Sequence, residues 1–392
     1  MMVLKLILVA ATALLLLPAA VLLVECLAGA VFWRRHRGEA LSQAVKRVAV
    51  LIPAHNEETS IGATVSRVRA QLASSDEVVV VADNCTDRTA EIAAAAGARV
   101  LQRSSTDCGK GFALAFGVQN LSENPPDVLI VLDADTRMED GSIQRLASEA
   151  MATGRPVQAI YLLLPGENAT LKQRISALAF LTKSLGRAAG ARLLNWPNQL
   201  FGTGMAFPWE LIRTAPLASG NIVEDVKLGI DLAIQRHAPR WCPDARVIGD
   251  IVPTDVDVQG QRRRWEHGHL YTLVTEVPRL FWQALRHGRM DLAGLALDLA
   301  VPPLSLLVLI LVLMQVVTVI FGLSAAQWTA AWLNGIAILA VMAGVLLTWT
   351  LHGRSIVPLR SLLGIPLYVA WKIPLYAAFL LKRQTKWNRS AR

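Results

Sequence analysis

Residues 128–135 read Val-Leu-Ile-Val-Leu-Asp-Ala-Asp, five apolar residues followed at once by two carboxylates that flank an alanine. An apolar run of this length is typical of a strand that is buried on both faces in a parallel sheet. In open sheets covered by helices, ligands bind beyond the carboxyl ends of the strands. The stretch therefore predicts a buried strand over Val128–Leu132 and a polar site at its end, where Asp133 and Asp135 lie.

Three further apolar runs precede this one, and segments with helical periodicity separate them. Strands are expected at Val48–Pro53, Glu77–Ala82 and Arg99–Gln102. Helices are expected at Glu58–Leu72, Thr86–Ala95 and Lys110–Val118. Strands that alternate with helices predict an α/β domain around a mostly parallel sheet. No Gly-x-Gly-x-x-Gly follows any of these strands, so a dinucleotide-binding domain loses its main support.

The whole chain is too apolar for an ordinary soluble protein. Of its 392 residues, 53% are hydrophobic and 18% are charged, whereas about 25% are charged in an average soluble domain. Leu6–Val24 holds 19 residues without a charge, which is close to the roughly 20 that span a bilayer as a helix. The apolar part of a signal peptide is shorter, about 7–15 residues. We therefore expect an uncleaved transmembrane helix within residues 1–33.

A second apolar region follows the α/β domain. Leu299–Leu351 contains no Asp, Glu, Lys, Arg or His. Two membrane spans are expected there, Ala300–Gly322 and Trp332–Leu351. A third apolar segment, Ser361–Leu381, contains Lys372 and runs into a basic tail at 382–392. If this segment crosses, the tail lies outside, against the positive-inside tendency. We expect an interfacial or re-entrant segment and keep a crossing as the alternative.

The net charge of the chain is +9, which in so apolar a protein indicates membrane lipids as partners, and nothing in the sequence supports nucleic acid. Basic residues follow the first apolar helix, whereas only Lys5 precedes it. This asymmetry predicts a cytoplasmic α/β domain. The expected organisation is a transmembrane helix at 1–33, the α/β domain at 46–285, a membrane bundle of two or three segments at 290–381 and a basic tail at 382–392.

The polar residues at the predicted strand ends suit a phosphate-bearing ligand. Asp133 and Asp135 could form a turn or cap a helix, but two carboxylates at one strand end also suit Mg²⁺ or Mn²⁺, which prefer oxygen ligands. Lys110, between two glycines at a helix start, suits a diphosphate; a solvated lysine is the plain alternative.

The first two strand ends carry further candidates. Asp83 could accept a hydrogen bond from the imide N–H of a uracil-type base. Asp83 or Asn84 could instead cap the next helix, and we expect Asn84 to cap while Asp83 binds. After the first strand, we prefer Glu57 to His55 as the ligand contact.

Two motifs lie beyond the first four strands. Glu224 and Asp225 open a helical stretch, where the helix dipole favours acidic residues and where a carboxylate could act as a general base. Residues 261–265 read Gln-Arg-Arg-Arg-Trp. Such a cluster beside a membrane bundle is by default a lipid-headgroup patch. Its arginines could also bind a leaving diphosphate, and Trp265 could stack on a sugar.

In this order, the motifs resemble those of the membrane-embedded family 2 glycosyltransferases, whose catalytic domain has the GT-A fold. Hyaluronan, chitin-oligosaccharide, cellulose and poly-N-acetylglucosamine synthases belong to this family, as do related exopolysaccharide glycosyltransferases. The resemblance covers about Lys46–Leu270, with Ala-Asp-Asn at 82–84 in place of the commoner Asp-Asp-Gly. It implies a catalytic base, Asp225; donor-binding residues Glu57, Asp83, Asp133 and Arg264; acceptor-binding residues Gly204, Glu224, Gln261 and Trp265; and metal ligands Asp133 and Asp135. Lys110 joins the donor-binding residues by its own position at a helix start.

The resemblance further implies an inverting, metal-dependent enzyme on the cytoplasmic face of the cell membrane, with a nucleotide sugar, UDP-linked by expectation, as the donor. Two acceptors stay open. The Gln-x-x-Arg-Trp motif favours a growing polymer, extended by a processive synthase, and the small number of membrane helices favours a lipid-linked oligosaccharide. A non-catalytic scaffold that kept the fold is a third possibility, although none of the expected acids is missing.

Overall fold

The computed structural model describes residues 1–38, 45–218, 223–250 and 255–381, with side chains between 255 and 381 described from 265 to 378. The chain divides into two compact units. The first, called here the helical unit, contains Met1–His36, Pro165–Trp196 and the stretch from Arg262 to Leu381. The second, called the sheet unit, contains Arg37–Leu164 and Pro197–Gln261.

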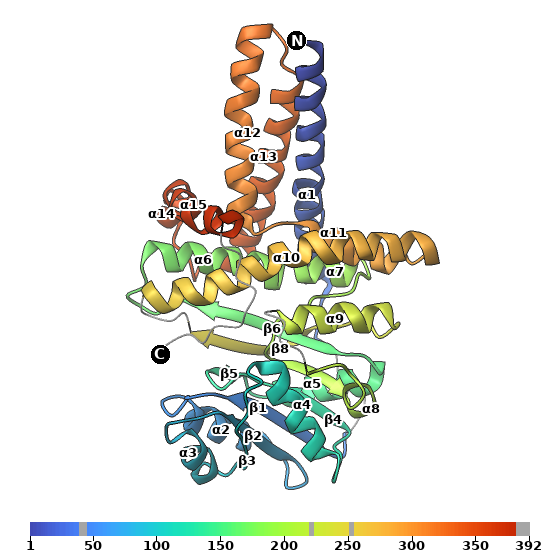
Figure 1. The fold of residues 1–392 in the computed structure, drawn as a ribbon, viewed down its shortest axis with the longest axis vertical. Helices are drawn as coiled ribbons and strands as arrows, with labels where there is room; N and C mark the ends of the chain where they lie inside the picture. The colour runs from blue at the N-terminus through green and yellow to red at the C-terminus, as the bar shows by residue number, and fades with distance from the viewer. Residues whose placement is uncertain (39–44, 219–222, 251–254, 382–392) are drawn as a thin grey trace. The chain divides into compact units, whose positions relative to one another are not determined.

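One eight-stranded sheet forms the centre of the described part of the sheet unit (Figure 1). Its strands are β1 (Val48–Ala54), β2 (Glu77–Asp83), β3 (Arg99–Arg103), β4 (Val128–Val131), β5 (Thr136–Met138), β6 (Val157–Leu164), β7 (Met205–Pro208) and β8 (Arg240–Asp250). They are ordered β3-β2-β1-β4-β7-β6-β8-β5. The first four are parallel, β7 is antiparallel to both β4 and β6, β8 is parallel to β6, and β5 is antiparallel to β8.

The helices of the sheet unit are α2 (Ile61–Arg69), α3 (Thr89–Ala95), α4 (Lys110–Leu121), α5 (Ser142–Thr153), α8 (Trp209–Ile212) and α9 (Glu224–Ile234). The predicted alternation of strands and helices up to residue 132 is confirmed. The prediction of a mostly parallel sheet, made from the first four strands, is confirmed for β1 to β4. Beyond them the sheet is mixed: β8 is parallel to β6, whereas β5 and β7 run antiparallel to their neighbours. These two strands have only three and four residues, too few to show a strand periodicity in the sequence.

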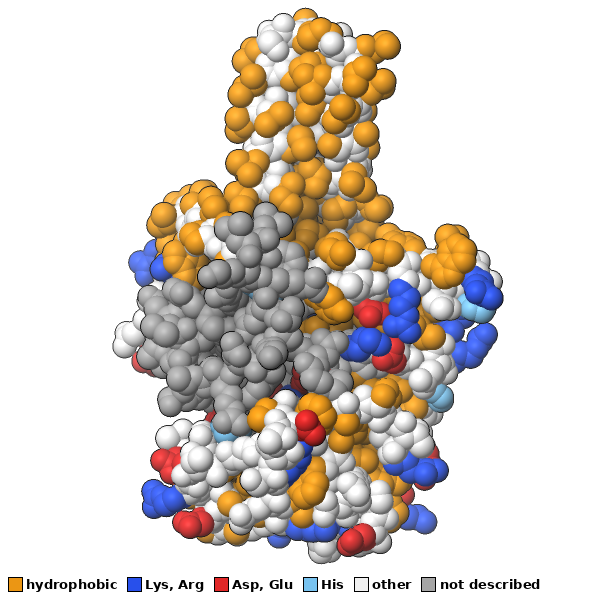
Figure 2. Space-filling view, viewed as in Figure 1, with side chains coloured by type: hydrophobic (Ala, Val, Ile, Leu, Met, Phe, Trp, Pro, Cys, Tyr) orange, Lys and Arg blue, Asp and Glu red, His pale blue; other side chains and the backbone are white. Residues whose placement is uncertain are grey.

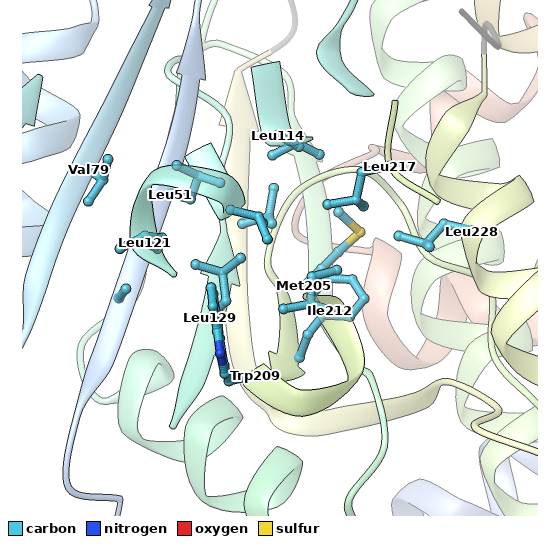
Figure 3. Close-up of a cluster of buried hydrophobic side chains, with 14 of the residues drawn as sticks. Leu51, Val79, Leu114, Leu121, Leu129, Met205, Trp209, Ile212, Leu217 and Leu228 are labelled. Atoms are coloured by element: carbon cyan, nitrogen blue, oxygen red, sulfur yellow. The ribbon is translucent and has the colours of Figure 1, made fainter. Parts of the chain in front are cut away.

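A cluster of buried side chains fixes α4 on the sheet (Figure 3). Leu51 of β1 and Leu129 of β4 are fully buried and pack in one cluster with Leu114 and Leu121 of α4. The helix comes closest at Gly117, where a Cβ atom would stand 2.5 Å from a methyl carbon of Leu51. Because only glycine permits this approach, the first residue of α4 is held at a defined distance from the sheet.

The helical unit contains α1 (Met2–Arg35), α6 (Leu171–Leu181), α7 (Ala188–Leu193), most of α10 (Asp255–His287), α11 (Met290–Ala300), α12 (Leu304–Ala325), α13 (Thr329–Thr348), α14 (Leu359–Leu362) and α15 (Ile365–Leu381). Two π-helical turns, η1 (Thr182–Arg187) and η2 (Trp349–Gly353), continue α6 and α13. Among the described residues, three helices are long and apolar enough to cross a membrane: Met2–Arg35, Leu304–Ala325 and Thr329–Gly353. Helices suited to crossing a membrane are therefore present near both ends of the described chain, and hydrophobic side chains cover much of the face of them seen in Figure 2.

The segment Pro165–Trp196 lies within the predicted domain 46–285 but belongs to the helical unit. An ion-pair network helps to hold it there. Arg187 Nε donates to Glu25 Oε2 at 2.6 Å, and Arg187 Nη2 donates to Asp298 Oδ1 at 2.5 Å. All three side chains are at least 90% buried. Glu25, the one charge inside the first apolar run, thus joins α1 to η1 and α11.

Candidate active site

The Asp133–Asp135 turn lies between β4 and β5 and is held by hydroxyl groups. The Asp133 N–H donates to Thr203 Oγ1 at 3.0 Å. Thr136 Oγ1 donates to the Asp133 carbonyl at 2.9 Å, and the two threonine hydroxyls lie 3.1 Å apart. The turn is thereby tied to the loop that precedes β7. The resemblance placed Thr203 in an acceptor loop, Gly202–Gly204, but its contact with the Asp133 turn was not predicted, because the loop lies 70 residues further along the chain.

Lys110 points into this turn from the first position of α4. Its ammonium donates to the Asp133 carboxylate and, at 2.7 Å, to the Gly202 carbonyl. The side chain is 17% exposed, so the alternative of a solvated lysine is wrong. Burial alone would lower the pKa of Lys110, but the carboxylates of Asp133, Glu224 and Asp225 together raise it above its ordinary value. The lysine therefore stays charged.

Gly202 forms the wall of the site between the lysine and α9. Its φ of +82° favours glycine. A Cβ atom at this position would stand 3.3 Å from both Asp225 Oδ2 and Lys110 Nζ. Gly204, two residues on, has a φ of +65°, and a Cβ there would stand 2.6 Å from Val247 in β8. The structure thus places Gly202 beside the carboxylates and Gly204 against the sheet; an acceptor contact at Gly204 stays a prediction.

The first two residues of α9 add two carboxylates to the cluster. Burial, and next the neighbouring charge of Asp225, raise the pKa of Glu224 to about 7, although Lys110 opposes the shift. Asp133, Glu224 and Asp225 thus lie around one ammonium group, and the cluster carries an excess of negative charge when all its members are ionised. Such a cluster favours a positively charged ligand, or one that binds together with a cation.

The residues present fit a divalent cation that is shared with a phosphate ligand. Within the described ranges, no group of three or more His, Cys, Asp and Glu side chains stands ready to hold a metal ion. The Asp133–Asp135 turn offers two carboxylates, and Mg²⁺ is usually held by one or two carboxylates together with substrate phosphates and water. Two carboxylates are therefore enough if the donor supplies the remaining oxygen ligands.

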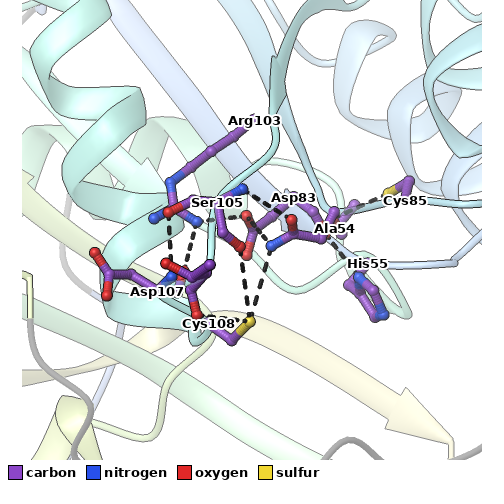
Figure 4. A network of polar contacts seen from close by, with 10 residues as sticks. Ala54, His55, Asp83, Cys85, Arg103, Ser105, Asp107 and Cys108 are labelled. Atoms are coloured by element: carbon purple, nitrogen blue, oxygen red, sulfur yellow. Dashed lines mark hydrogen bonds and ion pairs between the residues drawn. The ribbon is translucent and has the colours of Figure 1, made fainter.

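Asp83 ends β2 within a second polar network (Figure 4). Its Oδ1 accepts from Arg103 Nη1 at 2.6 Å and from Asn84 Nδ2 at 3.1 Å. Asn84 Oδ1 in turn accepts from the Ser105 N–H at 2.9 Å. The prediction that Asn84 caps the next helix is therefore wrong, because its side chain holds the loop after β3. Within this network Asp83 is buried, with 8% of its surface exposed.

Residues around this network differ from the sequence expectations in detail. Asp87, instead of Asn84, accepts from the backbone N–H of Thr89 at the start of α3, at 3.0 Å. Glu57 Oε2 accepts from Ser60 Oγ at 2.9 Å, so this carboxylate holds the turn before α2. The sequence did not suggest Arg103 as a site residue, because the predicted third strand ended one residue before it. The one sequence feature that could have indicated it is a basic residue at the end of a strand.

The structure does not describe the side chains of Gln261 and Arg264, two residues of the Gln-x-x-Arg-Trp motif, so their predicted roles lie outside the described residues. Trp265 is described and belongs to the helical unit. Its ring stacks on Phe180 of α6, with ring centres 6.3 Å apart and planes 26° apart. The two rings form an aromatic pair, called here the Trp265–Phe180 platform, and the stacking of Trp265 on a sugar stays a prediction.

The sequence matches the family description "Glycosyl transferase family 2" over residues 49–204. It also matches "Glycosyl transferase family group 2" over residues 128–379, which is more than half of the chain. The chain is a family 2 glycosyltransferase. The matched ranges include Asp83, Lys110 and the Asp133–Asp135 turn, and the predicted family and enzyme class are confirmed.

Relatives of this glycosyltransferase match it over part of their length. An uncharacterized glycosyltransferase of Mycobacterium tuberculosis is 35% identical over 121 residues, which is 29% of this chain and 51% of the relative. An undecaprenyl-phosphate 4-deoxy-4-formamido-L-arabinose transferase of Aeromonas hydrophila is 33% identical over 115 residues, 27% of this chain and 34% of the relative. The glycosyltransferase thus spans about half or less of the length of these relatives.

A solved structure supports the GT-A fold of this glycosyltransferase. The mannosyltransferase of Pyrobaculum calidifontis, in complex with GDP-Man and Mn²⁺, aligns with a TM-score of 0.51 over 95% of this chain and 100% of that one. The two sequences are 17% identical, so the likeness concerns the fold alone. The predicted GT-A domain with apolar helices near both ends of the chain is confirmed.

Proposed function

We propose that this glycosyltransferase moves a sugar from a nucleotide sugar, a UDP-sugar by expectation, to a membrane-associated glycan acceptor, with inversion at the anomeric carbon. The proposal rests on the carboxylate cluster around Lys110. This cluster brings together Asp133, a proposed ligand of the divalent cation, and Asp225, the candidate base. The GDP-Man and Mn²⁺ held by the mannosyltransferase of similar fold support a nucleotide-sugar donor and a divalent cation.

The donor would lie across the carboxyl ends of the parallel strands. Asp83 would accept a hydrogen bond from the base, and Glu57 would line the same end of the site. Asp133 and Asp135 would hold Mg²⁺ or Mn²⁺, whose charge neutralises the diphosphate. Lys110 would then exchange its bond to Asp133 for one to a phosphate oxygen, assisted by the N-terminus of α4.

The acceptor would approach from the side of α9 and Gly202. Asp225 would remove the proton of the acceptor hydroxyl, whose oxygen forms the new bond to the anomeric carbon as the bond to the diphosphate breaks. Arg264 and Lys110 would stabilise the departing nucleoside diphosphate. The other acceptor contacts expected from the sequence are Glu224, Gly204, Gln261 and Trp265.

The proposed setting is the cytoplasmic face of the cell membrane, in polysaccharide or cell-envelope glycan biosynthesis. Three helices suited to spanning, and a relative named for undecaprenyl phosphate, support a lipid-linked acceptor that gains one sugar. A processive synthase is the second candidate, favoured by the Gln-x-x-Arg-Trp motif. Purified protein in nanodiscs, incubated with UDP- and GDP-sugars and a membrane lipid extract, should yield a lipid product heavier by one sugar. A product ladder would favour the synthase, and no product with any donor would contradict the transferase.

Removing divalent cations should abolish transfer, and adding Mn²⁺ or Mg²⁺ should restore it. Asp135→Ala should weaken donor binding only when the cation is present, because the carboxylate acts through the cation. Asp140→Ala, on an exposed residue after β5, serves as the control and should behave like the unchanged protein. Donor binding by calorimetry with and without EDTA provides the measurement. Full activity in EDTA would remove the cation from the mechanism.

The raised pKa of Glu224, about 7, predicts how stability depends on pH in the donor-free protein. The folded state binds the proton more tightly than the unfolded state, so stability is highest below pH about 4.5 and falls until pH about 7. Glu224→Gln should remove this fall and, at pH 8, stabilise the protein by on the order of 3 kcal/mol. Thermal unfolding between pH 5 and 8 tests this, with Glu210→Gln as an exposed control. Parallel curves for Glu224→Gln and the unchanged protein would contradict the expectation.

A further inference from the structure

Lys372 is the only charged residue of α15, and it lies at the middle of this helix. Its side chain is 2% exposed, and its ammonium donates to the Glu266 carboxylate of α10. Glu266 directly follows Trp265 in the chain. A buried lysine is costly unless it is paired, so this contact ties the centre of α15 to the residue after the aromatic platform.

Further contacts join α15 to the same surroundings. Tyr376 and Ser305 of α12 share a hydrogen bond of 2.6 Å between their hydroxyls. On α6, Lys172 Nζ lies 4.3 Å from the ring centre of Trp371, the residue before Lys372. The helix α15 thus contacts both α10 and α6, the two helices whose rings, Trp265 and Phe180, stack on each other.

The ion pair between Lys372 and Glu266 also limits the depth at which α15 can lie in a membrane. A crossing helix of 17 residues is about 25 Å long, and its middle lies near the bilayer centre. The partner helix α10 carries charged residues on both sides of Trp265, among them Arg262, Glu266, Glu276 and Arg279, and charges at the bilayer centre are costly. Because Lys372 binds Glu266, the middle of α15 lies at the depth of α10, outside the hydrocarbon core.

The exposed side of α14, of the short link after it and of the start of α15 fits lipids at that depth. Leu359, Leu363 and Leu367 are 66%, 86% and 69% exposed. They belong to the same unit as the helices suited to spanning a membrane. An apolar face beside a polar, paired face is the pattern of a helix that lies in the membrane interface.

We propose that Glu266 and Lys372 are a positioning pair, which holds α15 in the membrane interface and fixes the Trp265–Phe180 platform for the acceptor. The proposal rests on the proposed function for the role of the platform. The pair itself touches no reacting atom and acts through Trp265.

Kinetics on three variants in nanodiscs test the positioning role. Lys372→Met and Glu266→Gln should each lower kcat/KM for the acceptor by about 10- to 100-fold, since small misplacements cost this much, and leave the donor KM within about 2-fold. The charge exchange, Glu266→Lys with Lys372→Glu, should recover most of the loss. Arg279→Met, in an ion pair further along α10 with the arginine 44% exposed, is the matched control. Equal effects on donor and acceptor, or no effect of Lys372→Met, would overturn the proposal.

Trp265→Ala in the same preparation separates this proposal from the proposed function. If Trp265→Ala raises the acceptor KM and Lys372→Met does not, the pair has no positioning role while the transferase assignment stands. If the unchanged protein transfers no sugar, the proposed function itself fails.

Depth measurements test the membrane placement in a protein that keeps the pair intact. Nitroxide labels on Leu367→Cys and Ala377→Cys, in a background where the four native cysteines are replaced by alanine, report depth through oxygen and nickel accessibility. Both labels should lie at the same shallow depth. A depth difference near 15 Å, the length of ten helical residues, would show a crossing helix and overturn the interfacial placement.

Discussion

Asp225→Asn should reduce turnover at least about 100-fold, because general-base catalysis contributes roughly 100- to 10,000-fold. The substitution keeps the size of the side chain and removes its capacity to take a proton. Asp225 lies at the start of α9 beside Gly202, and in the proposed mechanism it acts on the acceptor hydroxyl and does not bind the donor. Donor affinity should therefore stay close to normal.

Single-turnover rates and donor-binding isotherms, measured on one nanodisc preparation, separate the two effects. Asp231→Asn is the matched control, since it makes the same chemical change on α9, where Asp231 pairs with Lys227 at 2.5 Å. Normal turnover in Asp225→Asn would reject this residue as the base. Glu224, with a pKa of about 7, would then be the next residue to test.

Arg187→Met should destabilise the folded protein by about 3–5 kcal/mol, the usual effect of removing one partner from a buried ion pair. The substitution leaves the carboxylates of Glu25 and Asp298, whose side chains are 0% and 9% exposed, buried without their cation. Arg213→Met, which breaks an exposed pair with Glu210, should cost less than about 1 kcal/mol.

The triple variant Glu25→Gln, Arg187→Met, Asp298→Asn distinguishes lost charge pairing from lost packing. Because it removes all three charges together, it should recover much of the stability. Thermal unfolding in nanodiscs, followed by intrinsic fluorescence, measures all of these variants. A triple variant as unstable as Arg187→Met would mean that the shape of the arginine, and not its charge, holds the helices together.

The first half of the sheet and its acids could be predicted because the signals are local. Apolar runs such as Val128–Leu132 identify buried strands, and the residue that follows a parallel strand necessarily lies at the ligand-binding edge. Asp83 and Asp133 could therefore be chosen from position alone. The same reasoning selected Lys110, because a helix start next to a glycine is visible in sequence.

The contacts that were missed join residues far apart in the sequence. Thr203 holds the Asp133 backbone from 70 residues away, and Arg103 binds Asp83 across the edge of the sheet. Glu25 looked like an isolated charge because its partner lies 162 residues further along. Lys372 looked like a membrane charge of uncertain depth because Glu266 lies 106 residues before it. Sequence spacing holds no information on such pairs when only one chain is considered.

The distance along the chain between Glu25 and its partners has a consequence for biosynthesis. At about 5–20 residues per second, Arg187 leaves the ribosome roughly 8 to 30 s after Glu25, and Asp298 follows another 5 to 20 s later. During this interval α1 carries a carboxyl group without the arginine that neutralises it. The first helix can therefore enter the bilayer early but docks late, and a nascent chain arrested before residue 187 should be extracted from the membrane more readily than one arrested after residue 298.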